Sequence, residues 1–281
     1  VLQYYAMERF LYRLSMSPHG DKFVLKGALM LRAWRAPEVR PTMDIDVLGK
    51  TSNEQAAVVG QIQEILAVEV EPDGIVFDAE TVQAERITED ADYAGIRIRF
   101  RGTLESARIN MQVDVGFGDV VFPEPEAIVF PTLLDFPAPA LQGYSRESTI
   151  AEKFEAMVSF GELNSRMKDF FDIWLLSRTF DFDGNNLAEA IKQTFDRRGT
   201  ELPETITAFT PDFSAVKQVQ WRAFVRRLRG ERGIPDFAVV VSSIASFLSP
   251  LAQALHADAP MPDRWPAPGP WVHRNAEQLQ E

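Results

Sequence analysis

The hydrophobic pattern changes its period about halfway along the chain, and this change constrains the fold more than any other feature. Between residues 74 and 121, apolar and polar residues alternate in three stretches, as they do in half-buried strands. After residue 139 the apolar residues recur at helical spacing, and five prolines between 123 and 139 separate the two patterns. The sequence therefore predicts an α+β protein with a mixed sheet in its first domain, 1–135, and an all-helical second domain, 136–281, with an irregular Pro-rich tail from about 258.

The local patterns also predict individual elements. In the first half we expect a helix over 2–16, a strand ending at Gly27, a helix starting at Ala28, a strand over 42–49, a helix over 53–68 and the three strands within 74–121. In the second half we expect helices at 149–160, 165–179, 186–198, 212–229 and 236–255.

Composition excludes several classes of protein. The 281 residues include no Cys and only three His, which excludes disulfides and cysteine zinc sites and disfavours a His-based metal site. We see neither a signal-peptide pattern nor an apolar run long enough to cross a bilayer, so we expect a cytoplasmic protein without membrane contact. The net charge of −12 disfavours a broad nucleic-acid-binding face.

Any nucleic-acid contact must therefore use local basic patches. Taken alone, either of the two candidate patches is read first as a solvated face. The patches are Arg97, Arg99 and Arg101, and Arg222, Arg226, Arg227 and Arg229.

Two aspartates lie one residue apart in the predicted strand 42–49. Because side chains alternate in a strand, Asp44 and Asp46 share a face about 6.6–6.8 Å apart along it, while Met43, Ile45 and Val47 point to the core. Two such carboxylates repel each other, and a divalent cation between them relieves the repulsion. The alternative is that the pair is the solvated face of a half-buried strand.

A third acid fits the same chemistry. Asp114 lies between Val113 and Val115, where a carboxylate needs a partner or a metal. If its strand lies beside the Asp44 strand, three carboxylates converge and could hold two Mg²⁺ (or Mn²⁺) ions that clamp a nucleoside triphosphate and an attacking hydroxyl. The alternative is that Asp114 only ends a strand before a glycine turn.

The segment before this strand adds a phosphate-binding signal. Lys26 and Gly27 lie between a strand and a helix, and a helix N-terminus offers free N–H groups to an anion. Gly27 allows the backbone to approach a ligand closely. Strand, glycine turn, helix, D-x-D strand and a later lone Asp form an order that resembles the DNA polymerase β-like nucleotidyltransferase fold.

The second half narrows this resemblance. The chain resembles the AbiEii/AbiGii toxin family of nucleotidyltransferases, which includes the MenT-type toxins of toxin–antitoxin systems, over roughly residues 20–180. The family usually has Gly-Gly or Gly-Ser where this chain has Gly27-Ala28, so a phosphate contact at Ala28 must come from backbone N–H. The matching stretches are Lys26-Gly27-Ala28 with Leu31-Arg32, Asp44-Ile45-Asp46, Glu152-Lys153, and Arg166 with Lys168-Asp169 and Asp172.

The resemblance implies a Mg-dependent enzyme that moves a nucleoside monophosphate from an NTP to an acceptor hydroxyl, with the tRNA 3′ end as acceptor and an AbiEi-like antitoxin as partner. Two alternatives stay open: a protein hydroxyl as acceptor, and a catalytically weak binding partner. By the resemblance, the catalytic residues are Asp44, Asp46, Asp114, Lys153 and Asp169, the metal ligands are the first three of these, and the NTP contacts are Lys26, Gly27, Ala28, Arg40, Thr42 and Lys153.

Local patterns add three expectations. Thr149 and Glu152 form a capping box that places Lys153 in the first turns of a helix. Arg166, Asp169 and Asp172 share a helix face, either as a purely structural ion-pair ladder or with Asp169 at the site. Thr42 shares the face of Asp44, and we hypothesise that its phosphorylation blocks nucleotide binding, although a plain β-forming Thr is the alternative.

Overall fold

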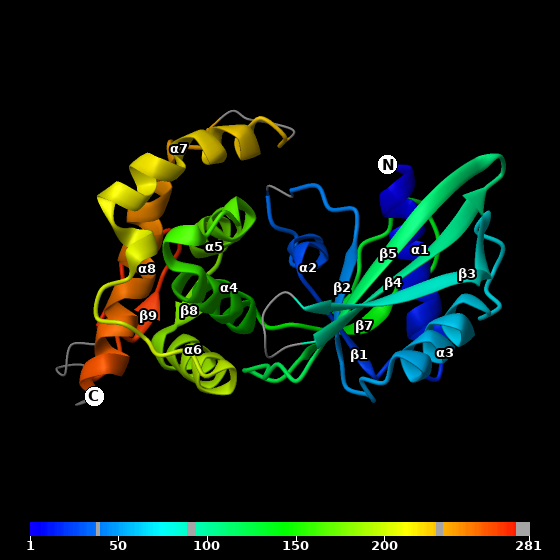
Figure 1. Cartoon of the computed structure of the whole chain (residues 1–281), viewed down its shortest axis with the longest axis horizontal. Helices are drawn as coiled ribbons and strands as arrows, with labels where there is room; N and C mark the ends of the chain where they lie inside the picture. Colours follow the sequence, from blue (N-terminus) through cyan, green and yellow to red (C-terminus); the bar gives the residue numbers. More distant parts are fainter. Residues whose placement is uncertain (38–39, 89–93, 229–232, 274–281) are drawn as a thin grey trace, which may run out of the picture. The chain divides into compact units, whose positions relative to one another are not determined.

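The computed structural model describes residues 1–37, 40–88, 94–228 and 233–273 (Figure 1). The chain divides into two compact units, and each unit collects segments that are distant in sequence. The sheet unit comprises Val1–Arg35, Pro41–Asp119 and Glu124–Tyr144, and the helical unit comprises Ala36–Arg40, Val120–Pro123 and Ser145–Glu281. The mixed α+β class expected from the sequence is confirmed, whereas a division into domains at residue 135 stays a prediction.

The sheet unit is built on one seven-stranded mixed sheet with the strand order β3-β4-β5-β2-β1-β7-β6. The pairs β2/β5 and β1/β7 are parallel, and the other neighbours are antiparallel. The strands are β1 Phe23–Lys26, β2 Ile45–Gly49, β3 Ile75–Thr88, β4 Ala94–Leu104, β5 Ala107–Phe117, β6 Glu126–Val129 and β7 Ala140–Gly143.

One face of this sheet is apolar and covered by helices. In β4 every second residue is buried, namely Ile96, Ile98 and Phe100. These side chains join one core with the helices α1 (Leu2–Met16) and α3 (Gln55–Leu66). Figure 1 draws both helices beside the sheet. A short helix, α2 (Ala28–Ala33), connects β1 to β2. The alternation therefore leaves the polar residues of β4 and β5 on the opposite face, which we call the polar face.

The Pro-rich segment 123–139 is more than the link between halves that the sequence suggested. It contains β6, whose four residues lie between Pro125 and Pro131, and it leads directly into β7. Proline cannot donate to a strand ladder, so the prolines flank these short strands rather than interrupt them. The segment thus completes one edge of the sheet.

The helical unit contains the five helices expected in the second half, with ends shifted by a few residues. Its core is rich in aromatic side chains, including Phe154, Phe170, Trp221, Phe237 and Phe247. Position 229, the expected end of the fourth of these helices and the last arginine of one basic patch, lies outside the described residues. The helices are α4 Arg146–Phe160, α5 Met167–Thr179, α6 Gly184–Arg198, α7 Pro211–Val225 and α8 Phe237–Ala257.

The described part of the C-terminal tail, residues 258–273, is more ordered than its composition indicates. Its residues Arg264–Trp265 form the strand β9, which pairs with β8 (Phe182–Asp183). The ring of Trp265 contacts Phe247 at 4.8 Å between centroids, and Trp271 stacks on the same ring at 5.7 Å. Aromatic burial therefore fixes a segment whose prolines suggested irregular structure, because two Trp side chains offer large apolar surfaces.

Helix α8 corrects one expectation from composition. By length and composition it is apolar enough to cross a membrane, although we saw no such run in the sequence. Core helices of globular proteins share this length and composition. In this structure Val240, Ile244, Phe247 and Leu251 are fully or almost fully buried, as expected of a core helix.

Helix α4 begins one turn earlier than the capping box predicted. The N-cap is Ser145, whose Oγ accepts a hydrogen bond from the backbone N–H of Ser148 at 3.1 Å. Thr149 lies inside the helix and donates its hydroxyl to the carbonyl of Ser145 at 3.1 Å. The predicted Thr149–Glu152 box is therefore wrong, because Ser145 offers the same hydroxyl to the free N–H groups first. As a result Lys153 lies in the middle of α4.

The cap can be tested by substitution. Ser145→Ala removes the cap and also the hydrogen bond that Ser145 Oγ donates to the carbonyl of Phe122 at 2.9 Å. We expect this change to lower the free energy of unfolding by about 1–2 kcal/mol, measured by urea denaturation. Thr149→Val keeps the side-chain shape and is expected to cost less. A larger loss in the Thr149 variant would show that the helix begins at Thr149.

Candidate active site

A row of charged residues crosses four neighbouring strands on the polar face of the sheet. In the strand register, Lys26 of β1 lies opposite Asp46 of β2, and Asp46 lies opposite Asp114 of β5. Asp114 in turn lies opposite Arg97 of β4. Directly opposite residues share a face, so the row runs cation, anion, anion, cation. We call these residues the charged row.

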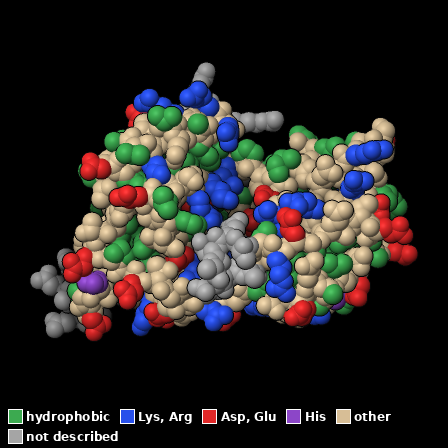
Figure 2. Space-filling model, in the orientation of Figure 1, with side chains coloured by type: hydrophobic (Ala, Val, Ile, Leu, Met, Phe, Trp, Pro, Cys, Tyr) green, Lys and Arg blue, Asp and Glu red, His purple; other side chains and the backbone are tan. Residues whose placement is uncertain are grey.

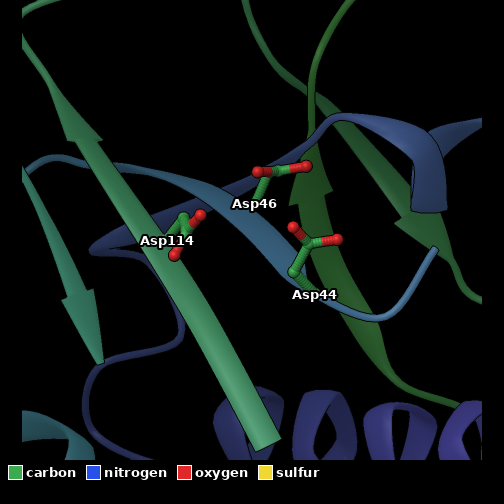
Figure 3. Close-up of side chains that lie close together, drawn as sticks. All are labelled: Asp44, Asp46 and Asp114. Carbon is green, nitrogen blue, oxygen red and sulfur yellow. The ribbon is translucent and has the colours of Figure 1, made fainter. Parts of the chain in front are cut away.

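Three carboxylates meet at the centre of this row (Figure 3). Oxygen atoms of Asp44, Asp46 and Asp114 all lie within 4.8 Å of one another, and the three side chains are half-buried. Asp44 lies immediately before β2, and the other two come from the adjacent parallel strands β2 and β5. The structure thus brings together the three residues that the sequence proposed as metal ligands.

Met43 differs from its expected position. Ile45 and Val47 are buried as the alternation predicts, but Met43 is 65% exposed. The strand begins only at Ile45, so Met43 precedes the hydrogen-bonded ladder and its side chain is not held in the strand alternation. Before the strand, a local contact orients Asp44: the Thr42 hydroxyl donates to Asp44 Oδ1 at 2.6 Å.

Thr42 is itself held in place on both sides. Its backbone N–H donates to the Tyr4 hydroxyl at 3.0 Å, and its side chain is bound to Asp44. Only 7% of the residue is exposed, so a kinase could reach the hydroxyl only after this segment opens. The phosphorylation hypothesis for Thr42 therefore stays a hypothesis that requires local opening.

Asp114 has a protein partner that the sequence pattern did not reveal. Arg97 Nε and Nη2 donate to its two oxygens at 2.8 and 2.7 Å, which is the bidentate geometry that fixes a carboxylate in orientation. The amide of Gln112 donates at 3.3 Å. Each carboxylate oxygen has further lone pairs, so this pairing still leaves acceptor positions on Asp114.

Gly27 is required by the backbone and by Asp46. Its φ of 71° lies in the region that side chains disfavour. A Cβ at this position would lie 2.1 Å from Asp46 Oδ2, far inside van der Waals contact. The backbone at Gly27 therefore passes directly against the carboxylate of Asp46. The side chain of the following Ala28 is 2% exposed, so it faces the interior rather than solvent.

Lys26, at the end of the charged row, pairs with Asp119, a residue that the sequence analysis did not identify. Its Nζ lies 2.9 Å from Asp119 Oδ2 and 5.0 Å from the centre of the Tyr144 ring. Asp119 follows Gly118, which has a positive φ, so the chain turns there and returns the carboxylate towards β1. The only sequence signal was an acid directly after a Gly-Phe-Gly turn.

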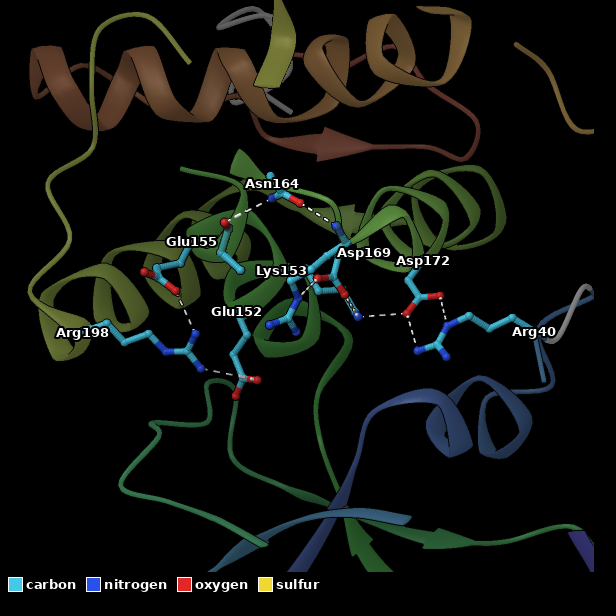
Figure 4. A network of polar contacts seen from close by, with 10 residues as sticks. Arg40, Glu152, Lys153, Glu155, Asn164, Asp169, Asp172 and Arg198 are labelled. Atoms are coloured by element: carbon cyan, nitrogen blue, oxygen red, sulfur yellow. Dashed lines mark hydrogen bonds and ion pairs between the residues drawn. The ribbon is translucent and has the colours of Figure 1, made fainter. Parts of the chain in front are cut away.

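A second charged group lies in the helical unit (Figure 4). Lys153 of α4 lies between two acids of α5, with its Nζ at 2.7 Å from Asp169 and 2.9 Å from Asp172. Arg166 pairs with Asp169 at 2.7 Å. Arg40 holds Asp172 through two hydrogen bonds, at 2.8 and 3.1 Å. The side chains of both acids are only 1–2% exposed, and we call these five residues the buried ion network.

Mutual pairing keeps the network charged. Burial alone would raise the pKa of Asp169, but Lys153 and Arg166 outweigh it and lower that pKa to about 2. For Asp172 burial is likewise outweighed, by Arg40 and Lys153, and its pKa is lowered. Burial would lower the pKa of Lys153, but Asp169 and Asp172 raise it. All three groups are therefore charged at neutral pH.

This network bears on both interpretations of the helical half. The Arg166–Asp169 pair of the structural alternative is present, and so is the Lys153–Asp169 contact of the functional one. Arg40 was expected to contact phosphate, but its guanidinium is buried against Asp172. The three aspartates belong to the sheet unit and the buried ion network to the helical unit, so their joint action in one site stays a prediction.

Two other acids of α4, Glu152 and Glu155, connect this helix to α6 through ion pairs. Arg198 of α6 lies 2.8 Å from Glu155 and 3.7 Å from Glu152. Figure 4 shows both contacts beside the buried ion network. Glu152, which forms one half of the Glu-Lys pair in the sequence, thus joins two helices while its neighbour Lys153 faces α5.

Comparison with known proteins supports a nucleotidyl-transfer site. The family described as "Nucleotidyl transferase AbiEii toxin, Type IV TA system" matches residues 9–243. Among solved structures, the chain is similar to JHP933 from Helicobacter pylori, with 17% identity, a TM-score of 0.49 and coverage of 89% of this chain and 93% of that one. It is also similar to a putative nucleotidyltransferase from H. pylori, with 15% identity, a TM-score of 0.47 and coverage of 89% of this chain and 92% of that one. No curated protein matches the sequence.

The buried ion network makes a stability prediction. Asp169→Asn leaves Lys153 and Arg166 without one buried partner, and we expect a loss of about 3 kcal/mol in the free energy of unfolding at pH 7. The pKa of Asp169 is lowered on folding, so its contribution is present above 3.8 and is lost as the pH falls towards about 2.

The difference in stability between wild type and Asp169→Asn should therefore shrink below pH 3.8, as measured by urea denaturation at stepped pH. Asp196→Asn is the matched control, because Asp196 is exposed on α6 and its side chain makes neither a hydrogen bond nor an ion pair within the described residues. If this difference in stability stays constant down to the lowest pH at which the protein folds, the ion pairs of Asp169 do not stabilise the fold as proposed.

Proposed function

Because the chain belongs to the AbiEii family of nucleotidyl transferase toxins of type IV toxin–antitoxin systems, we propose that it transfers a nucleoside monophosphate from an NTP to the 3′ end of tRNA. The observation that carries this proposal is the convergence of Asp44, Asp46 and Asp114 on the polar face. Modification of the tRNA 3′ end blocks aminoacylation and arrests translation, which is an effect suited to a toxin.

The three carboxylates of Asp44, Asp46 and Asp114, which we call the acid group, fit a divalent cation. Its donors are carboxylate oxygens, which Mg²⁺ and Mn²⁺ prefer, and three of them lie within reach of one ion. The missing side chain at Gly27 makes room for the Asp46 carboxylate, which lies where a Cβ would otherwise be. Asp44, Asp46 and Asp114 would hold the metal. When bound, it supplies Lewis-acid stabilisation of the charge that develops on the phosphates.

The protein's own groups divide the remaining work. In the proposed reaction the acceptor oxygen forms a bond to the α-phosphorus, the α–β phosphoanhydride bond breaks, and pyrophosphate leaves with the bonding electrons. The acceptor proton passes to a carboxylate oxygen of Asp114, which Arg97 holds in a fixed orientation. Such a site works mainly by positioning and charge stabilisation.

Lys153 is proposed to neutralise phosphate charge, as the family resemblance implies. Its ammonium has three N–H donors, and Asp169 and Asp172 take two of them. The raised pKa keeps this group cationic, which a phosphate contact requires. Asp169 then acts by orienting the ammonium.

The cellular setting follows from the proposed substrates. We propose that the enzyme acts in the cytoplasm, where NTPs and tRNA occur, and that its partner is a cognate AbiEi-like antitoxin. A protein hydroxyl is the second acceptor class, because nothing in the acid group itself selects RNA over protein.

The acceptor can be identified directly. Purified protein is incubated with Mg²⁺, each labelled NTP and either total tRNA or cell lysate with and without ribonuclease. We expect label in tRNA and loss of label after ribonuclease. Label that stays in protein after ribonuclease would replace the tRNA proposal by protein nucleotidylation.

The acid group makes the sharpest activity prediction. Asp46→Asn removes a central charge with little change in shape, and we expect label transfer to fall by at least about 100-fold. Asp21→Asn makes the same chemical change at an exposed position in the turn before β1 and should keep full activity. Undiminished transfer and toxicity in Asp46→Asn would remove the metal-site interpretation and favour a binding partner without catalysis.

Gly27 gives a separate test of the cation site. Gly27→Ala forces a Cβ against Asp46 at a positive φ, so we expect a stability loss of about 1–3 kcal/mol and weaker Mn²⁺ binding, measured by water proton relaxation. Gly116→Ala is the matched control, since its Cβ would meet Asp119 and Lys26 only at 3.8 and 3.9 Å. Equal Mn²⁺ affinity in the two variants would exclude Gly27 from the site.

A further inference from the structure

Four arginines extend from the acid group along the polar face, and we call them the arginine row. Arg97, Arg99 and Arg101 alternate in β4 with buried residues, so their side chains share the polar face. Arg108 of β5 precedes the buried Ile109 and lies opposite Thr103 of β4. Arg97 lies opposite Asp114, so the row begins beside the acid group and leads away from it.

The members of the row differ in how they are paired. Arg97 is bound to Asp114, and Arg99 pairs with Glu85 of β3 at 2.9 Å, with both side chains about half exposed. Arg101 and Arg108 are exposed, and within the described part of the chain their guanidinium groups make neither a hydrogen bond nor an ion pair. Two members of the row are thus positioned to bind a ligand from solvent.

The surroundings of the row favour a polyanion over a protein partner. A protein interface is usually anchored by large apolar or aromatic residues at its centre. The polar face of β4 and β5 carries only charged and polar residues from Arg97 to Asp114, and Figure 2 shows Lys and Arg side chains along this hairpin. These residues are Arg97, Arg99, Arg101, Thr103, Arg108, Asn110, Gln112 and Asp114.

We propose that the arginine row binds the phosphate backbone of an RNA strand and leads its 3′-terminal hydroxyl to Asp114. Alternate residues of a strand are about 6.6–6.8 Å apart, so the row repeats at a spacing comparable with that of successive phosphates in an extended RNA strand. This inference rests on the proposed function for its RNA acceptor. Backbone contacts of this kind position a strand without reading its sequence.

The row is local, which reconciles RNA binding with the charge of the protein. At a net charge of −12 the protein repels polyanions at long range, so a short row of cations must supply the attraction. Glu85 weakens the row because it competes with phosphate for Arg99. The contact is therefore expected to be weak, salt-dependent and improved by removing Glu85.

Binding is tested without catalysis. The probe is a fluorescein-labelled RNA hairpin with a short single-stranded 3′ tail, and anisotropy is measured with the full chain over a series of salt concentrations. The variant R101A/R108A should bind roughly ten-fold more weakly at physiological salt, and its log K against log salt slope should be smaller by about 1.4, as expected for two lost phosphate contacts.

Arg86→Ala is the matched control. Arg86 is an exposed arginine of β3 that lies opposite Ile96, so it belongs to the other face of the same sheet. The Arg86→Ala variant should bind the probe as tightly as the wild type. A loss of binding free energy in Arg86→Ala that is at least half of the loss in R101A/R108A, which removes two charges instead of one, would mean that only net charge matters and would overturn the proposal. No loss in R101A/R108A, or no binding by the wild type, would also overturn it.

Glu85→Gln gives a prediction of opposite sign. Freeing Arg99 from its ion pair should tighten RNA binding by a few fold and increase the salt slope by about 0.7. A purely structural role of the arginines would not produce tighter binding. Unchanged or weaker binding in Glu85→Gln would remove Arg99 from the row.

Label transfer separates this inference from the proposed function. In the transfer assay the loss in R101A/R108A is expected in the KM for RNA. If the wild type labels RNA and R101A/R108A does so with an unchanged KM, the arginine row is wrong and the proposed function stands. If the row binds RNA as predicted while no NTP gives transfer to RNA, the row stands and the proposed function fails.

Discussion

The structure of the site depends on one unfavourable contact, the placement of Asp46 directly beside Asp114 in parallel strands. Like charges at opposite positions of a sheet destabilise it, so this register needs compensation. The flanking cations Lys26 and Arg97 supply part of it, and a cation between the carboxylates would supply the rest. Gly27 follows from the same contact, because the position of Asp46 leaves no room for a side chain there.

Alternation made much of this site predictable. It placed Ile45 and Val47 in the core and Asp46 on the opposite face, and the order of glycine turn, D-x-D strand and lone Asp indicated which strands meet. The same rule failed at Met43, because alternation holds only after the chain has joined the hydrogen-bonded ladder. Arg97 could not be identified as the partner of Asp114, since that pair depends on cross-strand register rather than on any local pattern.

In the helical unit, periodicity located the helices but not their long-range contacts. The predicted capping box competed with Ser145, a better-placed hydroxyl one turn earlier, and local sequence does not rank two such caps. The Lys153–Asp169 contact was expected only by resemblance, and Arg40 was expected at phosphate. Its partner is instead Asp172, 132 residues away, because a buried carboxylate needs a compensating charge and the fold brings Arg40 to it.

The distribution of charge separates the three aspartates from the proposed RNA-binding row. The acid group attracts cations and repels phosphate, so an RNA strand cannot settle there through its backbone alone. Positive charge one strand away, on β4, offers the backbone a separate track and leaves only the terminal hydroxyl to approach Asp114. On our proposal, an acidic protein with a short arginine row would favour RNA ends over duplex surfaces, because a long duplex brings more phosphates near the negative surface than the row can neutralise.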